Sequence, residues 1–214
     1  MTIRLRLPFS LAALDWTSHI LVVCGLAGIG VFVWSRSEGW VYQRVQTAHF
    51  ERSIAAPAAV TVEPARTPEP RRAVAKRPRM LAPDPAVLGE IEVPRLGVRA
   101  IVRDGSDPAS LRRAVGHVSG SALPGAQGNS VIAGHRDTFF RALRRAERGD
   151  EIRLRLRNAT VRYAIDSLVI VAPDAVEVMQ PSEQARLTLI TCYPFDWVGP
   201  APRRMVIGAH ALTK

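Results

Sequence analysis

Cys192 stands near the end of the stretch 187–194, which alternates in polarity, is rich in β-branched residues and ends in Pro194. The pattern is typical of a buried strand. Because proline cannot donate to a sheet ladder, the strand is expected to end near Cys192. A cysteine at the end of a strand is well placed to meet a substrate, and its thiolate is a nucleophile. Alternatively, Cys192 is a small buried hydrophobic residue, as most free cysteines are.

Two other side chains could cooperate with this cysteine. His135 follows the apolar segment 130–134, and Arg204 precedes the apolar segment 205–209. If the strand before His135 ran parallel to the strand of Cys192, both residues would lie at one rim. A connection of roughly ten residues would return the next strand antiparallel and bring Arg204 back to that rim. A neighbouring positive charge favours the thiolate, and an arginine donates hydrogen bonds to an oxyanion.

These side chains need a framework of short strands, and the region from residue 87 onward provides one. Turn formers separate several of the predicted strands, which favours an all-β barrel or sandwich. Asp107 and Pro108 match an N-cap and a first helical position, so a short helix is expected over 109–115. Another short helix could cover 139–145. The predicted strands are 90–93, 99–102, 130–134, 151–156, 162–171, 186–192 and 204–210.

Residues 16–35 contain no Asp, Glu, Lys or Arg, and they predict a transmembrane helix. About twenty residues at 1.5 Å rise cross a hydrocarbon core roughly 30 Å thick. Trp16 and Trp34 stand at the two ends, as in an aromatic belt. Arg4 and Arg6 favour a cytoplasmic N-terminus, with the rest of the chain exported. A cleaved signal peptide is the alternative interpretation.

The anchor and the predicted barrel are joined by a segment of different composition. Residues 41–54 predict a short amphipathic helix at the outer membrane surface, and 55–85 are rich in proline, alanine and charge. Such a sequence cannot bury a core and predicts an extended spacer. The predicted organisation is a cytoplasmic N-terminus over 1–15, an anchor over 16–35, a helix and spacer over 36–86, and a catalytic domain over 87–214.

The motifs resemble those of the sortases, the membrane-anchored cysteine transpeptidases of the bacterial cell envelope. The family's Thr-Leu-x-Thr-Cys motif stands here at 188–192, its Gly-His pair at 134–135, and its arginine at Arg204. The resemblance covers about residues 91 to 211. The segment 192–195 and the turn at 199–202 resemble class C or class D members. Class C enzymes usually carry an Asp-Pro-aromatic lid, but Ala86 follows Asp84-Pro85 here, so a class D-like enzyme is favoured.

This resemblance implies a closed eight-stranded sortase-type barrel with short helices and a two-step acyl transfer without cofactor or metal. Cys192 would attack the threonine carbonyl of a Leu-Pro-x-Thr-Gly-like sorting signal at the C-terminus of a protein substrate. His135 would act as general acid and base, and Arg204 would hold the oxyanion. Thr188 and Thr191 are weaker candidates for shaping the substrate pocket. The acceptor would be an amine on an envelope component or a protein.

Two other functions remain open at this stage. One is a different cysteine hydrolase or transpeptidase of the envelope, although papain-like and NlpC-type hydrolases place the cysteine before the histidine in the chain. The other is an anchored, non-enzymatic β-domain that binds an envelope polymer. The net charge of +10 comes largely from arginine and includes a basic cluster at 71–79. A solvated charge run is the favoured interpretation of that cluster, ahead of contact with anionic polymers or lipids, and no nucleic-acid partner is expected.

Overall fold

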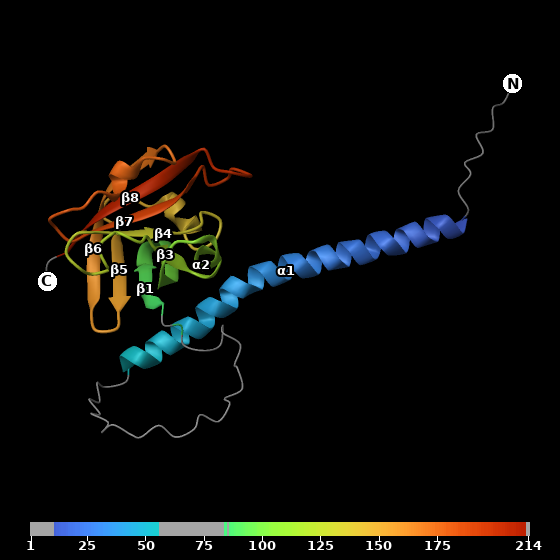
Figure 1. Ribbon diagram of the computed structural model, residues 1–214, viewed down its shortest axis with the longest axis horizontal. Coiled ribbons are helices and arrows are strands. Elements are labelled where there is room, and N and C mark those ends of the chain that lie inside the picture. The colour runs from blue at the N-terminus through green and yellow to red at the C-terminus, as the bar shows by residue number, and fades with distance from the viewer. Residues whose placement is uncertain (1–10, 56–83, 85, 213–214) are drawn as a thin grey trace, which may run out of the picture. The chain divides into compact units, whose positions relative to one another are not determined.

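The computed structural model describes residues 11–55, 84 and 86–212 (Figure 1). The chain divides into two compact units, Met1–Glu38 and Gly39–Lys214. Helix α1, Leu11–Ala55, contributes residues to both. The basic cluster at 71–79 and nearly all of the predicted spacer at 55–85 lie outside the described residues, so those predictions stay untested.

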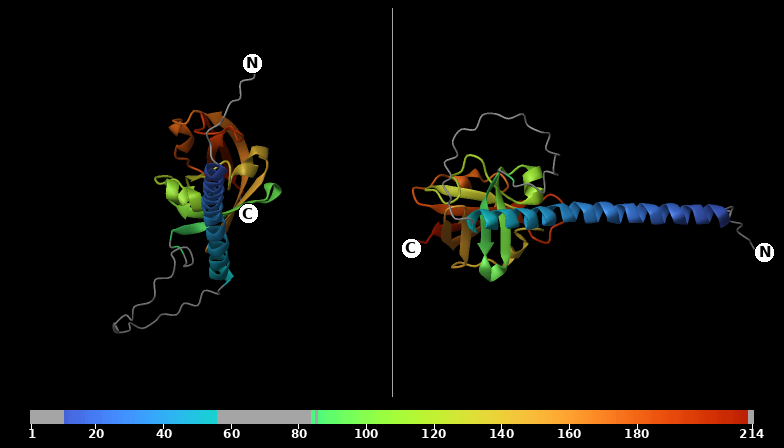
Figure 2. Two further views of the ribbon diagram at one scale, coloured as in Figure 1. Left: turned by 90° about the vertical axis from the view of Figure 1, so that its right-hand side faces the viewer. Right: turned by 90° about the horizontal axis from the view of Figure 1, so that it is seen from below.

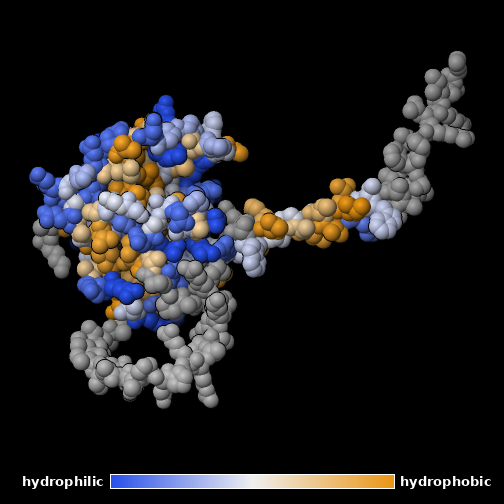
Figure 3. Space-filling view, viewed as in Figure 1, coloured by the Kyte–Doolittle hydropathy of each residue, from blue (hydrophilic) through white to orange (hydrophobic). Residues whose placement is uncertain are grey.

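The first unit contains the stretch of α1 that the sequence predicts as an anchor. The side chains from Trp16 to Trp34 are exposed, and most of them are apolar (Figure 3). Among the described residues, α1 is the one helix long and apolar enough to cross a membrane. Its length and composition are compatible with the predicted anchor, and its orientation stays a prediction.

The second unit is built on a closed barrel whose strands lie in the order β1-β2-β3-β4-β7-β8-β6-β5 (Figures 1 and 2). The predicted all-β, eight-stranded barrel is therefore confirmed. Short helices connect some of the strands: η1 (Pro94–Leu96), α2 (Pro108–Arg113), η2 (Arg141–Arg145) and η3 (Val176–Met179). The strands are β1 (Val87–Val93), β2 (Val98–Asp104), β3 (Val115–His117), β4 (Asn129–Ala133), β5 (Glu151–Leu156), β6 (Thr160–Val171), β7 (Arg186–Tyr193) and β8 (Arg203–Ala211).

Seven of these strands correspond to predicted segments, and β3 is the one that the sequence did not predict. It has three residues, too few to show an alternating pattern, and it follows α2 almost directly. The Asp107 carboxylate caps α2 by accepting hydrogen bonds from the N–H groups of Ala109 and Ser110, as the sequence predicts. β3 then pairs in parallel with β2 and antiparallel with β4, which closes that side of the barrel.

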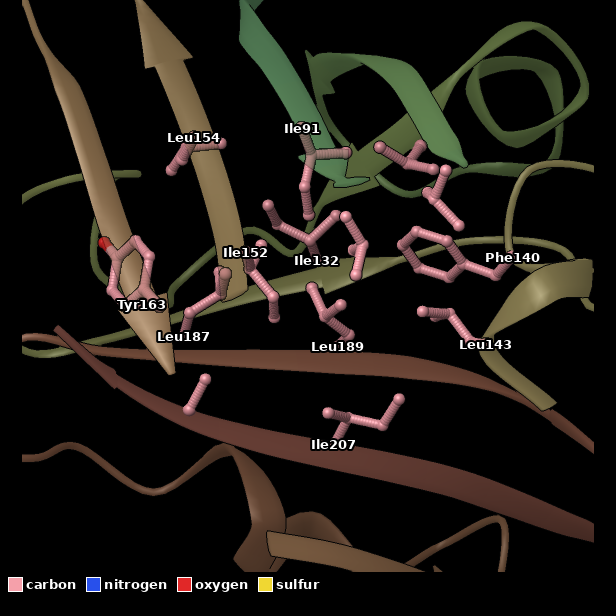
Figure 4. Close-up of a cluster of buried hydrophobic side chains, with 14 of the residues drawn as sticks. Ile91, Ile132, Phe140, Leu143, Ile152, Leu154, Tyr163, Leu187, Leu189 and Ile207 are labelled. Carbon is pink, nitrogen blue, oxygen red and sulfur yellow. The ribbon is translucent and has the colours of Figure 1, made fainter. Parts of the chain in front are cut away.

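The barrel interior is filled by alternate residues of neighbouring strands. Ile132 of β4, Leu189 of β7 and Ile207 of β8 stand beside each other in the register and point into one cluster (Figure 4). Moving a side chain of this size from water into the core stabilises the folded state by roughly 1.5–3 kcal/mol. The same alternation sends Ile190 and Cys192 of β7 to the outer face.

The C-terminal part of α1, from Gly39 to Ala55, belongs to the second unit and packs on the outer face of β1 and β2. Tyr42 and Phe50 are buried against Ile101 of β2. The Gln43 side chain accepts a hydrogen bond from the Ile101 N–H and donates one to the Arg113 carbonyl. The predicted helix at 41–54 is present, and its apolar face lies on the barrel. The compact unit thus begins at Gly39, upstream of the boundary predicted at residue 87.

Candidate active site

Cys192 lies one residue before the end of β7, on the outer face of the barrel. Leu187 and Leu189 are buried in the core, whereas Ile190 and Cys192 are partly exposed. The peptide bond between Tyr193 and Pro194 is cis, and the chain leaves the sheet there. The thiol is not part of a disulfide. Cys192 is therefore accessible at a strand end, the position the sequence predicts.

Arg204 stands directly opposite Cys192 in the antiparallel ladder of β7 and β8. Residues opposite each other in such a pair point to the same face, with Cβ atoms about 4.5–5.5 Å apart. Arg203 pairs with Tyr193 instead and is exposed. Because successive side chains alternate across a strand, Arg204 shares the face of Cys192 and Arg203 does not.

His135 follows β4, which pairs in parallel with β7. This is the arrangement under which the sequence would bring His135 and Cys192 to one rim. Ala133 lies beside Ile190, and the Gly134 N–H donates to the Ile190 carbonyl over 3.1 Å. Cys192 and Arg204 form one row across β7 and β8. His135 stands two residues beyond the last paired residue of β4, Ala133, at the same end of the sheet.

The backbone around His135 is fixed on both sides. The Thr191 hydroxyl donates to the Gly134 carbonyl over 2.8 Å, and the Phe140 N–H donates to the His135 carbonyl over 3.0 Å. The Phe140 ring packs against Gly134, where a Cβ would lie 2.6 Å from a ring carbon. Figure 4 shows this ring at the edge of the core. The glycine before the histidine is therefore explained by close packing.

The guanidinium of Arg204 is partly held by its own backbone surroundings. Its Nη1 donates to the carbonyls of Ala201 and Arg203, over 3.2 and 3.0 Å. Within 11–55, 84 and 86–212, no carboxylate pairs with this guanidinium, so its other N–H groups can donate to a substrate oxygen. Asp137, two residues after His135, is the carboxylate nearest to the histidine in the sequence. It is exposed, and within the same ranges no hydrogen bond joins it to His135.

Arg136, which the sequence analysis missed, fastens the loop 194–202 between Cys192 and Arg204. Its Nη2 donates to the carbonyls of Trp197 and Gly199, over 2.7 and 3.0 Å. Its Nη1 is buried without a hydrogen-bond partner in the described part of the chain. A second, exposed contact joins Arg144 to Asp196 over 2.8 Å. In the sequence, the one signal for Arg136 is that it directly follows His135. Its contacts with Trp197 and Gly199 depend on the fold.

A recess of about 370 Å³ continues from the row of Cys192 along the outer face of β6, β7 and β8. Val169 and Val206 face each other across β6 and β8. They line the recess together with Val178 of η3 and Pro181 of the loop that follows it. Thr188 also lines the recess. Its hydroxyl donates to the Asn129 side chain over 2.7 Å.

Thr191 has a different position from Thr188. It is buried, and its hydroxyl bonds to Gly134, so it fixes the backbone beside His135. The sequence did not predict the apolar lining of the recess. Val206 could have been found from the alternation of β8, because it lies two residues after Arg204. In the described part of the chain, no group of three or more His, Cys, Asp or Glu side chains could hold a metal ion.

Comparisons with known proteins match the barrel region. A family model described as the sortase domain matches residues 91–212. Sortase D of Bacillus subtilis is 36% identical over 126 residues, 58% of this chain and 64% of that protein. Sortase A of Listeria monocytogenes is 31% identical over 111 residues, half of each chain. This chain therefore spans less than two thirds of the length of both curated relatives.

Solved structures show the same fold. A sortase D5 transpeptidase from Clostridium perfringens gives a TM-score of 0.55 at 25% identity, covering 59% of this chain and 79% of that one. A lid mutant of sortase A from Corynebacterium diphtheriae gives 0.56 at 29% identity, covering 60% and 71%. The similarity to sortase D supports the class D-like resemblance.

Proposed function

Because the chain belongs to the sortase family, we propose that it is a membrane-anchored cysteine transpeptidase with Cys192, His135 and Arg204 as its catalytic residues. Its substrate is a protein with a C-terminal Leu-Pro-x-Thr-Gly-like sorting signal, and its acceptor is an amine on an envelope component or a protein. The catalytic domain is extracytoplasmic. The observation that supports the proposal is the pairing of Cys192 with Arg204 on β7 and β8, beside the end of β4 that precedes His135.

In the first step, the Cys192 thiolate attacks the threonine carbonyl carbon. The tetrahedral intermediate collapses to a thioester when the C–N bond breaks, and His135 gives a proton to the leaving amine. In the second step, His135 takes a proton from the acceptor amine, which attacks the thioester and releases the thiolate. Arg204 donates a hydrogen bond to the oxyanion in both steps.

The recess beside this row supports the choice of substrate. Its apolar side chains, Val169, Val178, Pro181 and Val206, suit a Leu-Pro pair. The recess begins on the row next to that of Cys192, since Val206 lies two residues after Arg204. An extended peptide with its threonine carbonyl at Cys192 would place the preceding Leu-Pro pair over this lining.

The decisive test uses a labelled sorting-signal peptide and full-length protein in detergent. Acid quench followed by mass spectrometry should show an acyl adduct on Cys192. The Cys192→Ala variant should lose both cleavage and transfer while keeping its fold by circular dichroism, because only one sulfur atom is removed. Turnover that survives in Cys192→Ala would refute the mechanism.

An added amine distinguishes the alternatives. A transpeptidase should give a peptide joined to the amine, whereas a hydrolase should give only the free acid. A non-enzymatic binding domain should form no adduct at all.

A further inference from the structure

A second, polar recess continues the groove beyond the apolar one. It measures about 740 Å³, and its titratable side chains are Asp166 of β6, Arg186 of β7, His210 of β8 and Glu183 of the loop before β7. Arg186 also lines the apolar recess, so the two are adjacent.

A β-bulge brings the side chains of the polar recess together. β6 pairs Ile165 with Ala209 but Ser167 with Gly208, which leaves Asp166 as the extra residue. Bulges often re-aim a side chain next to a functional site. The Asp166 carboxylate accepts two hydrogen bonds from Arg186, over 2.8 and 2.9 Å, and lies 3.1 Å from His210 Nδ1.

Asp166 carries its charge at neutral pH. Burial raises the pKa of this carboxyl, but the hydrogen bonds and charge of Arg186, with the contact to His210, lower it by more. The net pKa therefore lies below the ordinary value for an aspartate.

Gly208 lines the apolar recess beside Arg186. A Cβ there would lie 2.3 Å from the Ser167 hydroxyl oxygen, 3.3 Å from a guanidinium nitrogen of Arg186 and 3.4 Å from a carboxylate oxygen of Asp166. The glycine therefore gives these three side chains room to pack against β8. Because Arg186 lines both recesses, a peptide that crosses the apolar recess meets the polar one next.

For a sorting signal that runs along β7 with its N-terminal side toward Arg186, as the proposed function has it, the strand spacing sets which part would reach the polar recess. Arg186 lies six residues before Cys192 on the same face of β7, a distance of about 20 Å at roughly 3.3 Å per residue. An extended peptide with its threonine at Cys192 has its Leu about 10 Å away. Residues about two to four positions before that Leu would lie at Arg186 and His210.

Carboxylates outnumber guanidinium groups in the polar recess, whereas the whole chain is basic. Asp166 and Glu183 are two carboxylates against the one guanidinium of Arg186. The whole chain carries +10. Glu183 is exposed at the recess wall, where its carboxylate can meet a ligand.

We propose that the polar recess is a substrate subsite for a basic side chain, Lys or Arg, located about three residues before the Leu of the sorting signal. The proposal rests on the proposed function, because the register of the peptide is set by acyl transfer at Cys192. It adds an upstream specificity determinant to that reaction, with Asp166 and Glu183 as its charged groups.

The test compares peptides that differ only at the third residue before the Leu, with Lys, Ala or Glu there, on full-length protein in detergent. The kcat/KM values should fall in the order Lys, Ala, Glu, with about a fivefold to tenfold difference between Lys and Glu, because a partly exposed charge pair contributes little. Moving the Lys to the eighth residue before the Leu should abolish the preference.

Two substitutions locate the effect. Glu183→Gln should reduce the Lys-to-Glu ratio at least twofold. Glu177→Gln, in the exposed helix η3 and outside the recess, should leave the ratio unchanged. Equal kcat/KM for the three peptides, or an unchanged ratio in Glu183→Gln, would overturn the subsite.

Binding to Cys192→Ala separates failure of the subsite from failure of the proposed function. If no peptide is turned over, the proposed reaction is refuted, and equilibrium binding of fluorescein-labelled peptides to this variant then decides the subsite. A Lys-over-Glu preference that Glu183→Gln reduces supports the subsite. Equal binding of the Lys and Glu peptides refutes it.

Discussion

The outer faces of β1–β2 and of β6–β8 both carry apolar side chains, but only the first is covered. Ile101 is fully buried because Tyr42 and Phe50 of α1 pack over it. Val169, on the face that leads to Cys192, is 47% exposed. Exposed apolar surface beside polar groups is characteristic of binding sites. The comparison separates a face whose burial stabilises the unit from a face available to a ligand.

The charged groups of the two faces also differ in whether other protein side chains contact them. Glu90, on the covered face, is buried and contacts the guanidinium groups of Arg99 and Arg155 over 2.7 and 2.8 Å. Thr47 of α1 donates to the same carboxylate. On the open face, the described residues place no carboxylate against Arg204, and Cys192 is partly exposed. The buried carboxylate of the covered face is paired with two guanidinium groups, whereas the part of the open face next to Cys192 keeps a guanidinium that can donate to a substrate.

The largest expected effect tests the covered face. Phe50→Ala removes a buried aromatic ring and should reduce the free energy of unfolding by about 3–5 kcal/mol. Denaturant unfolding of the full chain in detergent measures this loss. Because the groove lies on another face, kcat/KM of the folded variant should stay near the wild-type value.

Arg52→Ala is the matched control for Phe50→Ala. Arg52 lies in the same turn of α1 as Phe50, but its side chain is exposed. It should change the free energy of unfolding by less than about 0.5 kcal/mol. If both variants unfold at the same denaturant concentration as the wild type, α1 does not stabilise the barrel.

The next effect concerns the open face. Arg204→Ala should lower kcat/KM by about 10²–10³, the cost of removing one oxyanion donor. Arg204→Lys should restore little, because an ammonium lacks the planar fork of donors. Arg203→Ala, on the other face of β8, should have little effect. If Arg203→Ala lost most of its kcat/KM while Arg204→Ala kept nearly all of it, Arg203 and not Arg204 would be the catalytic arginine.

Local sequence patterns predict some of these elements and not others. The period of two predicted β4, β7 and β8, and the short connection after Cys192 predicted that β8 returns antiparallel to β7. The parallel direction of β4 and β7 was only a condition for His135 and Cys192 to meet. The same alternation could not reveal β3, which has three residues. The apolar spacing of 41–54 predicted that one helix face is buried, but it could not distinguish a membrane surface from β1 and β2. A bulge such as that at Asp166 depends on the pairing of β6 with β8, which local sequence does not determine.

A smaller effect is expected at the loop between Cys192 and Arg204. Arg136 is a positioning residue there, because it bonds to the Trp197 and Gly199 carbonyls and touches none of the reacting groups. Arg136→Ala should lower kcat about tenfold, because catalysis is sensitive to small misplacements. Arg136→Lys, which keeps the charge but loses the fork of donors, should rescue little.

Arg144→Ala provides the control for this loop. It removes the exposed ion pair with Asp196, which contributes at most about 1 kcal/mol, and kcat should change less than twofold. The measurement is kcat and KM separately, with the melting temperature of each variant. Equal losses in Arg136→Ala and Arg144→Ala would mean that loop stability in general, and not Arg136, aligns Arg204.

The smallest effect returns to the covered face, where Asp84 links β1 to α1. Its carboxylate accepts hydrogen bonds from the Tyr42 hydroxyl over 2.8 Å and from the Ala86 N–H over 3.0 Å, and Arg103 Nε lies 3.0 Å away. Burial raises the pKa of this carboxyl, but the hydrogen bonds and the charge of Arg103 outweigh it, so the pKa lies below its ordinary value.

A carboxyl whose pKa is lowered by folding stabilises the folded state above its unfolded pKa of about 4, and this contribution is lost as the pH falls through the folded value. Asp84→Asn should therefore be less stable than the wild type at pH 7, and the difference should shrink between pH 4 and pH 2. Denaturant unfolding at stepped pH measures it, with the exposed Asp174→Asn as a variant expected to match the wild type at pH 7. A difference that stays constant down to pH 2 would show that Asp84 acts through packing and that its charge does not hold α1 on the barrel.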